Sequence, residues 1–487
     1  MKKIKFLITF LIFVGQWGVA HCQQVDSLST YLEIAAKKNA SVIQRYAEYQ
    51  AALQKVPQVG SLSDPELSTG IFLSPMELVG GNQLADIRLM QMFPWFGVLK
   101  AAKDEMSLMA RAKFESFQEA KLQLYFEVQQ SWYGLYKIQR AVEISQKNLE
   151  ILRTLERLSL VRFKAAAVSG GSYSSGGGSS ISSVSQGNSG MQTMGGASKS
   201  AAQVPSQMQG AVAPMQGAAA SMQGQSSGSG LADLYRIQME TNELENNISG
   251  LKNQQTTLVA RFNSLMNRPP QTPVVTPVDL KSEVPGISLV TVSDSMLTNS
   301  PMLEMLKYES KAIDARKLMV TKMGFPMVGL GLNYSLINKN PMSTSSMNGK
   351  DMVMPMVTVT LPVNRKKYRS MQTETDFLKA ANQQGIQAAR NSLQSEYYEA
   401  VQEFEDTRRR IELYKNQYKL AKQSLNILMV SFSTAGAGLN DLLQIRRQTL
   451  DYELKQTDAL ADFNTAIARI KKLANNHVNE NSDNRYK

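Results

Sequence analysis

The sequence is nearly without cysteine and histidine. Its 487 residues include one cysteine, Cys22, and two histidines. A single cysteine excludes an intrachain disulfide and any metal site built from several thiolates. So few histidines argue against a catalytic triad and a histidine-rich metal site, and no Gly-rich phosphate-binding loop is present. We therefore expect no enzymatic activity and no cofactor.

Long apolar runs are missing beyond the N-terminus. Residues 1–22 have the form of a signal peptide, with three early lysines, an apolar run from Phe6 to Val14 and small residues near Ala20. No later run reaches the roughly 18 apolar residues that a membrane-spanning helix needs. An exported chain of this kind can be integral to a membrane only as a closed β-barrel. Cys22 is a candidate for lipidation, but His21 before it is bulkier than a lipidation signal generally has, and ordinary cleavage is the alternative.

A block of basic residues is also lacking. Lys and Arg exceed Asp and Glu, giving a formal net charge of +12, but the positive side chains are spread along the chain and form no stripe with interleaved aromatic residues. We interpret them as solvated helix surface and expect no nucleic-acid partner.

Proline is absent from two long stretches, residues 98–164 and residues 364–432, and the first contains only one glycine, Gly134. Apolar residues recur there every seven positions, which is coiled-coil spacing: Val128, Leu135, Val142 and Leu149. A helix of about 65 residues would be on the order of 100 Å long at ~1.5 Å per residue. Apolar periodicity resumes over residues 231–266 and again from Leu460 to Leu473. The sequence therefore predicts two long helical hairpins.

Shorter elements precede each long stretch. Helical spacing predicts two short helices over residues 27–53, joined around Asn39 and ended by Pro57, and further short helices over residues 293–322. Alternating residues predict strands over residues 66–73, 84–93, 325–337 and 352–363. A turn-rich piece containing Ser74-Pro75 and Gly80-Gly81-Asn82 is expected between the first two strands.

The order of these elements occurs twice, which predicts an internal duplication. The expected organisation is a signal peptide (1–22), a first repeat (23–268), a Pro-rich connection (269–291), a second repeat (292–475) and a polar tail (476–487). A low-complexity segment, residues 165–230, interrupts the tip of the first hairpin. Four strands cannot close a barrel, so several copies must pool their strands, and three copies would give twelve.

Two short segments carry a resemblance to a known family. Residues 63–67, Ser-Asp-Pro-Glu-Leu, and residues 91–97, Gln-Met-Phe-Pro-Trp-Phe-Gly, accompany the duplicated strand, strand and long hairpin order. The chain resembles the TolC-like outer-membrane efflux family, and these segments resemble its metal-cation branch. The resemblance implies a mainly α protein that forms a homotrimer in the bacterial outer membrane, with a twelve-stranded β-barrel in lipid and a periplasmic α-barrel. It further implies a passive exit duct that binds a periplasmic adaptor protein and an inner-membrane pump of the resistance-nodulation-division type.

The resemblance also points to residues at the hairpin tips. Asp441 and Asp233 match the acidic residues at the family's periplasmic entrance, where symmetry-related carboxylates would concentrate negative potential and favour cations. The alternative is that each aspartate caps the returning helix. The turn of the second tip is expected to contact the adaptor, through Gly436, Gly438, Leu439 and Asn440.

The insertion in the first tip is rich in Gly, Ser and Met. Met208, Met215 and Met222 each begin a Met-Gln-Gly triplet, and Met191 and Met194 precede them. Thioethers are soft ligands that select Cu(I) and, by the same softness, Ag(I). One hypothesis is that the segment gathers such an ion at the channel entrance. The alternative is flexible filler or a docking tail. For the whole chain, the alternative of another class is a periplasmic coiled-coil scaffold or adhesin without a pore.

Overall fold

The structure, a computed structural model, describes residues 27–78, 80–169, 229–282, 289–434 and 438–475. The expected signal peptide, the polar tail and most of the insertion lie outside these ranges. The chain divides into two compact units, one formed by residues 1–148 with 246–487 and the other by residues 149–245. The boundaries of the two expected repeats stay a prediction.

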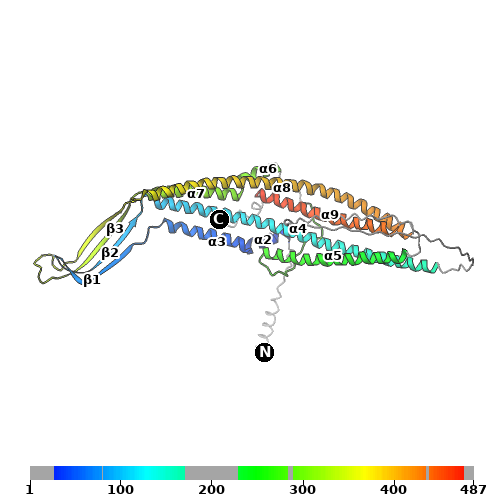
Figure 1. The fold of residues 1–487 in the computed structure, drawn as a ribbon, viewed down its shortest axis with the longest axis horizontal. Coiled ribbons are helices and arrows are strands. Elements are labelled where there is room, and N and C mark those ends of the chain that lie inside the picture. The colour runs from blue at the N-terminus through cyan, green and yellow to red at the C-terminus, as the bar shows by residue number, and fades with distance from the viewer. Residues whose placement is uncertain (1–26, 79, 170–228, 283–288, 435–437, 476–487) are drawn as a thin grey trace, which may run out of the picture. The chain divides into compact units, whose positions relative to one another are not determined.

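Helices make up most of the described chain, and the order of elements occurs twice (Figure 1). The first series is α2 (Leu28–Lys38), α3 (Ala40–Gly60), β1 (Glu66–Leu78), β2 (Gly81–Phe93), α4 (Val98–Ser169) and α5 (Ser229–Leu265). The second series is α6 (Leu289–Asn299), α7 (Pro301–Met323), β3 (Met327–Asn338), β4 (Met352–Thr360), α8 (Arg365–Ser433) and α9 (Leu439–Leu473). The predicted combination of long helices with a small amount of sheet is confirmed.

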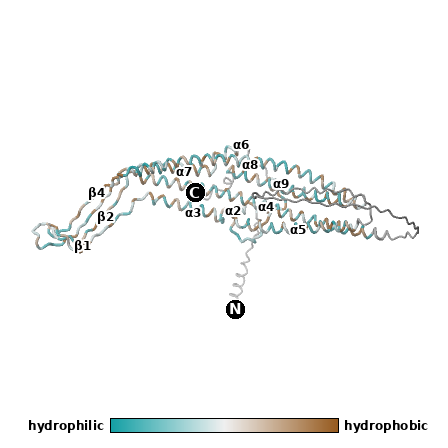
Figure 2. Tube along the Cα trace, viewed as in Figure 1, coloured by the Kyte–Doolittle hydropathy of each residue, from teal (hydrophilic) through white to brown (hydrophobic). Residues whose placement is uncertain are grey.

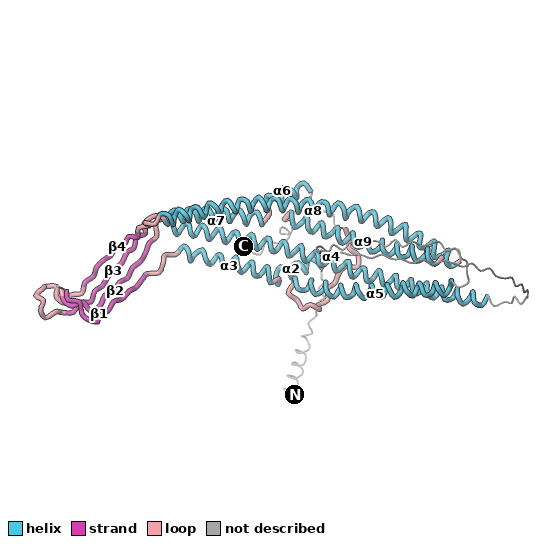
Figure 3. The backbone as a smooth tube through the Cα atoms, in the orientation of Figure 1, coloured by secondary structure: helices cyan, strands magenta, loops and turns pink. Residues whose placement is uncertain are grey.

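The strands form one antiparallel sheet in the order β1-β2-β3-β4 (Figure 3). The central pair, β2 and β3, joins the two series, and β1 and β4 are the edges. Since paired residues project from the same face and successive residues from opposite faces, the register divides the sheet into two faces. One row reads Leu67, Leu89, Leu332 and Pro355, and the next reads Ser68, Arg88, Asn333 and Met354. We call these the aliphatic face and the polar face.

The first two strands are longer than expected because the Ser74-Pro75 segment does not end β1. The strand continues to Leu78, with an irregular register between Ile71 and Met76. Proline lacks an N–H group, so at a sheet edge it interrupts the ladder without ending the strand. The turn lies further on, where Gly81 has a φ of +124°. A Cβ atom at that position would overlap the Asn338 carbonyl oxygen, so glycine is required there.

The short helices separate at Asn39 as predicted. The Asn39 side chain accepts hydrogen bonds from the N–H groups of Ser41 and Val42, at 2.9 Å and 3.2 Å, and so caps α3. The prediction that Pro57 ends this helix is wrong, because α3 continues to Gly60. The proline removes one backbone hydrogen bond to the preceding turn, but only three residues of the helix follow it, so any distortion is confined to the helix end.

Two hydrophobic clusters hold the helices of the larger unit together. In the first, Tyr31 of α2 meets Phe262 of α5 edge to face at 5.1 Å, beside Val128 of α4. In the second, Phe404 of α8 stacks on Phe463 of α9 at 5.2 Å. Hydrophobic and hydrophilic residues are interleaved along these helices (Figure 2). None of the described helices contains an apolar stretch long enough to cross a membrane.

Candidate functional site

The first hairpin tip belongs to the smaller unit, residues 149–245. Apolar side chains from both arms are buried between the end of α4 and the start of α5: Leu152, Leu155, Ile237 and Leu244. Polar contacts flank them. The Arg153 guanidinium lies 2.9 Å from the Glu245 carboxylate, and the Gln238 amide donates to Glu156 at 3.0 Å. These contacts hold the two arms together as a coiled-coil pair.

Asp233 lies in α5 beyond its first turn, which contains no acidic residue. It is half-buried. Burial raises the pKa of the Asp233 carboxyl, and the guanidinium groups of Arg236 and Arg162 partly oppose that rise. Because Asp233 follows the first turn, it does not occupy a cap position of this helix. The acidic residue of the first tip is therefore half-buried and influenced by the charges of two arginines.

The second hairpin tip belongs to the larger unit. Helix α8 ends at Ser433, where the Thr434 N–H group bonds to the carbonyl oxygens of Phe432 and Val430, and α9 begins at Leu439. Apolar side chains on both sides of the turn are buried: Phe432, Leu439, Leu442 and Leu443. The predicted tip residue Leu439 is therefore largely part of the hairpin core.

The polar residues of the second tip face outward. Asn440 and Asp441 are exposed, and Asp441 is the acidic residue of the first turn of α9. A carboxylate in this turn interacts favourably with the helix dipole. The N-cap residue is Gly438, and no side-chain hydrogen bond caps it. Gly438 has a φ of −77°, which any residue adopts, so its backbone does not require glycine.

A buried arginine of the second tip was not predicted from the sequence. Arg446 of α9 is only 2% exposed and is the bulkiest of the fully buried side chains in the described chain. It follows Leu439 and Leu442 on the buried face of the helix. The pattern contained a signal for it, because Leu439, Leu442, Leu443 and Arg446 follow the spacing of three and four that marks an apolar stripe.

Ion pairs between α4, α8 and α9 were also not predicted. The Lys137 ammonium of α4 lies 3.0 Å from Asp462 and 3.7 Å from Asp458, both on α9. Arg410 of α8 reaches Asp462 at 3.6 Å. Burial raises the pKa of Asp458, while the nearby Lys137 ammonium opposes the rise. The three helices are therefore connected by charges that hydrophobic spacing could not reveal.

A second group of charges lies between α8 and α9. Arg469 contacts Glu399 at 2.9 Å and Glu403 at 3.4 Å, and Lys472 contacts Glu396 at 3.2 Å. Unlike the exposed pair of the first tip, this group is partly buried on the arginine and lysine side.

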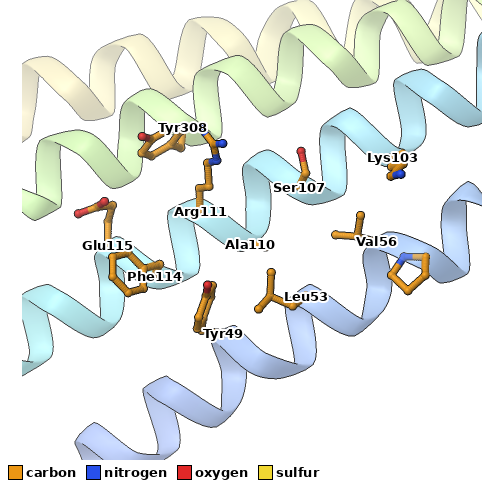
Figure 4. Close-up of a pocket in the computed structure, with 11 residues that line it drawn as sticks. Tyr49, Leu53, Val56, Lys103, Ser107, Ala110, Arg111, Phe114, Glu115 and Tyr308 are labelled. Carbon is orange, nitrogen blue, oxygen red and sulfur yellow. The ribbon is translucent and has the colours of Figure 1, made fainter. Parts of the chain in front are cut away.

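An apolar groove of about 680 Å³ lies between α3, α4 and α7 (Figure 4). Aromatic rings form part of its walls. Tyr49 packs against Phe114 at 5.3 Å, and the Arg111 guanidinium lies 5.9 Å from the centre of the Tyr308 ring. Burial, together with the charge of Glu304, raises the pKa of Glu115 at its edge. None of the predicted site residues lines this groove.

Several predicted residues lie outside the described ranges. They are Gly436, the methionines Met191, Met194, Met208, Met215 and Met222, and Cys22. Their predicted roles stay predictions. Among the described residues, no group of three or more His, Cys, Asp or Glu side chains is placed to hold a metal ion. Asp233 and Asp441 belong to different units.

Comparison with solved structures gives strong similarities of fold. The structure is similar to CusC, a protein that forms a transmembrane channel, with a TM-score of 0.66 and 11% identity over 92% of this chain and 91% of CusC. It is similar to the outer membrane protein VceC of Vibrio cholerae, with a TM-score of 0.64 and 12% identity over 92% and 96% of the two chains. It is also similar to the CmeC outer membrane channel of Campylobacter jejuni, with a TM-score of 0.65 and 11% identity over 92% of this chain and 85% of CmeC.

No protein-family model matches the sequence, and no curated protein matches it. The TM-scores of 0.64 to 0.66 establish the fold. At identities of 11% to 12%, the similarity does not establish the activity. The fold is that of the outer-membrane channels. The resemblance to the TolC-like family is thereby confirmed for the fold, over almost the whole described chain.

Proposed function

We propose that this protein is the outer-membrane channel of a tripartite efflux system. Three copies pool their sheets into a twelve-stranded barrel in lipid, and their helical hairpins form a periplasmic duct. The duct is passive, because the energy for transport comes from an inner-membrane pump of the resistance-nodulation-division type. A periplasmic adaptor protein connects the pump to the hairpin tips.

The observation that carries this proposal is the sheet, whose aliphatic face is uncovered. Exposed side chains run across all four strands, among them Leu67 at 65%, Ile71 at 79%, Leu332 at 49% and Val357 at 71%. A continuous apolar surface of this kind marks a site that contacts lipid or another protein. The sheet also has two edges within one chain, β1 and β4. Open edges are not stable in hydrocarbon, so pairing of β1 with β4 of another copy would satisfy both.

The proposal is tested by fractionating cells that express the full chain. We expect heat-modifiable trimers in the outer-membrane fraction and stepwise conductance when the purified trimer is added to a planar bilayer. Cysteine pairs placed on β1 and β4, in a chain with Cys22→Ser, should crosslink copies into trimers. Recovery as a water-soluble protein without conductance would support the scaffold or adhesin alternative instead.

The tip acids are proposed to form a cation-selective entrance, with Asp441 as the main contributor. It is exposed in the first turn of α9, where three symmetry-related copies would face one aperture. Asp441→Asn should lower the preference for cations in bilayer recordings more than Asp233→Asn does, because Asp233 is half-buried beside Arg236. If Asp441→Asn and the unmodified channel had equal cation selectivity, the proposal that the tip acids form a cation-selective entrance would be wrong.

Adaptor binding is proposed at the second tip, through Gly436, Gly438, Leu439 and Asn440. Asn440→Arg changes an exposed position without opening the leucine core. It should weaken copurification of the adaptor while trimers and conductance remain. Unchanged copurification would move the adaptor to another surface.

The cargo is proposed to include copper or silver ions, gathered by the methionines of the insertion. Deletion of residues 168–228 should then reduce copper and silver tolerance while the trimer still assembles. Unchanged tolerance in a strain with normal trimer levels would show that the insertion has another role.

A further inference from the structure

Two glycines of β3 lie on the polar face of the sheet, next to methionines of the neighbouring strands. Gly331 pairs with Met90 of β2 and with Met356 of β4, whereas Gly329 pairs with Met92 of β2 and with Thr358 of β4. Directly paired residues project from the same face. The methionines therefore flank a part of β3 that has no side chains of its own on this face.

The glycines leave space for the thioether groups. The Met92 Sδ lies 2.6 Å from the position that a Cβ atom would take at Gly329, so the sulfur occupies the space of the missing side chain. At Gly331, Met356 Cβ lies 3.7 Å from the corresponding position. The Cα atoms of Met90 and Met356 are two strands apart, about 9.5 Å. Two methionine side chains can close that gap above Gly331.

Met354 extends the group, because it lies two residues before Met356 on the same face of β4 and pairs with Asn333. We call Met90, Met92, Met354 and Met356 the methionine cluster. Two charges lie beside it. Glu66 of β1 pairs with Met90, and Arg88, which pairs with Asn333, is two residues before Met90. Glu66 and Arg88 thus place one charge of each sign at the margin of the cluster. The metal-binding atoms of the cluster itself are neutral thioether sulfur atoms.

We propose that the methionine cluster binds a soft monovalent cation, Cu(I) or Ag(I). Thioether sulfur is a soft donor that selects such ions over harder divalent cations. Methionine stands on both sides of Gly331, and the Met92 sulfur fills the space beside Gly329, so thioether groups gather over a part of β3 that has no side chains of its own on this face. A methionine that only fills space can adapt its flexible side chain to many surroundings, so that role would not require glycines beside it.

Binding by the cluster does not depend on the proposed function, but its use in transport does. If the polar face lines the lumen of a barrel, three copies place three clusters along the path of the cargo. Conduction requires sites that bind weakly enough to release the ion, and a cluster of neutral ligands meets this requirement better than a carboxylate cage.

The test is a methionine oxidation footprint of the purified full chain in detergent, with silver nitrate as the probe. Each methionine is followed separately by mass spectrometry after hydrogen peroxide treatment, so binding in the insertion does not obscure the result. At a silver concentration about ten times the dissociation constant, the unbound fraction falls about tenfold. We expect oxidation of the cluster to slow accordingly, while Met302 and Met319 of α7 keep their rates. Equal protection of all methionines, or none, would overturn the proposal.

Two variants separate ligand loss from structural damage. Replacing Met354 and Met356 by leucine removes two ligands and leaves Met90 and Met92 as reporters, whose silver protection should fall. The control M239L/M302L/M319L/M323L should keep the protection of all four cluster methionines. Gly329→Ala retains every methionine but displaces the Met92 sulfur, and should weaken silver protection. Conductance of the M354L/M356L variant in a planar bilayer reports separately on the channel. Full conductance of this variant with lost protection of Met90 and Met92 supports the cluster, and unchanged protection of both would overturn it. Full silver protection of the unmodified chain without conductance would refute only the channel.

Discussion

The two hairpin tips contain nearly the same motif in opposite surroundings. The first reads Leu-Ala-Asp-Leu from Leu231, and the second reads Leu-Asn-Asp-Leu from Leu439. Leu231 is 43% exposed, whereas Leu439 is 4% exposed. The exposure of the acidic residues is the reverse of this, because Asp233 is half-buried and Asp441 is exposed. The motif therefore lies near the start of both return helices, but the burial of each of its residues depends on what packs against it.

The largest expected effect concerns the cores, where the two series resemble each other. Phe262→Ala and Phe463→Ala should each lower the free energy of unfolding by about 3–5 kcal/mol, the usual cost of removing a buried phenylalanine. Guanidinium unfolding followed by circular dichroism measures it. Phe377→Ala on α8, where the ring is 72% exposed, is the control and should change little. A large effect in only one series would show that the two cores are not equivalent.

The next effect distinguishes the tips directly. Leu439→Ala should cost about 2–4 kcal/mol because it leaves a cavity beside Leu442 and Leu443. Leu231→Ala should change the free energy of unfolding by no more than about 0.5 kcal/mol, since the Leu231 residue is 43% exposed. Hydrogen exchange of the amides at each tip gives a local measurement. Similar costs at both positions would contradict the different burial of the two leucines.

A smaller difference is expected from the ion pairs of the two hairpins. Arg469→Ala should cost up to about 1 kcal/mol, because it removes contacts with Glu399 and Glu403 at a partly buried position. Arg153→Ala should cost only about 0–0.5 kcal/mol, because its pair with Glu245 is exposed. The comparison is repeated in high salt, where the remaining effect of Arg153→Ala should disappear. A salt-insensitive loss at Arg153 would indicate a packing role instead.

The smallest effect is the pH dependence of the first tip. Burial raises the pKa of Asp233 in the folded state, so the folded tip holds its proton more tightly than the unfolded chain does. Stability from this group is present below the unfolded pKa and falls as the pH rises through the folded pKa. Asp233→Asn should remove this fall, as seen in amide exchange of α5 between acidic and neutral pH. Asp441→Asn is the matched control, and an unchanged slope in Asp233→Asn would exclude Asp233 as the cause.

The sequence predicts the elements well where local signals are strong. Long stretches without proline mark α4 and α8, and Asn39 marks the break between α2 and α3 through its side-chain cap. Predictions fail where a breaker residue is tolerated. Pro57 stands three residues before the end of α3, so the hydrogen bond that it removes affects only the helix end. Pro75 stands in an edge strand, where a proline is tolerated.

The site is less predictable than the fold, because its properties depend on contacts between distant residues. Asp233 and Asp441 look equivalent in sequence, yet Asp233 is half-buried near Arg162 of α4, whereas Asp441 is exposed. Arg446 shows the same limit, since its charge suggests solvent while its spacing indicates the core. The two faces of the sheet are implied by alternation, but which methionine lies beside which glycine depends on strand register.

The uncovered aliphatic face has a consequence for the life of a newly made chain. Leu73 of β1 is fully exposed, and no described element covers the row from Leu67 to Pro355. This surface gains its burial only from contacts beyond one chain. If the proposed trimer forms, the last stage of its maturation should be concentration-dependent, and a single copy would be prone to aggregate. Supply of chains, rather than the speed of helix formation, would then set how fast working assemblies accumulate.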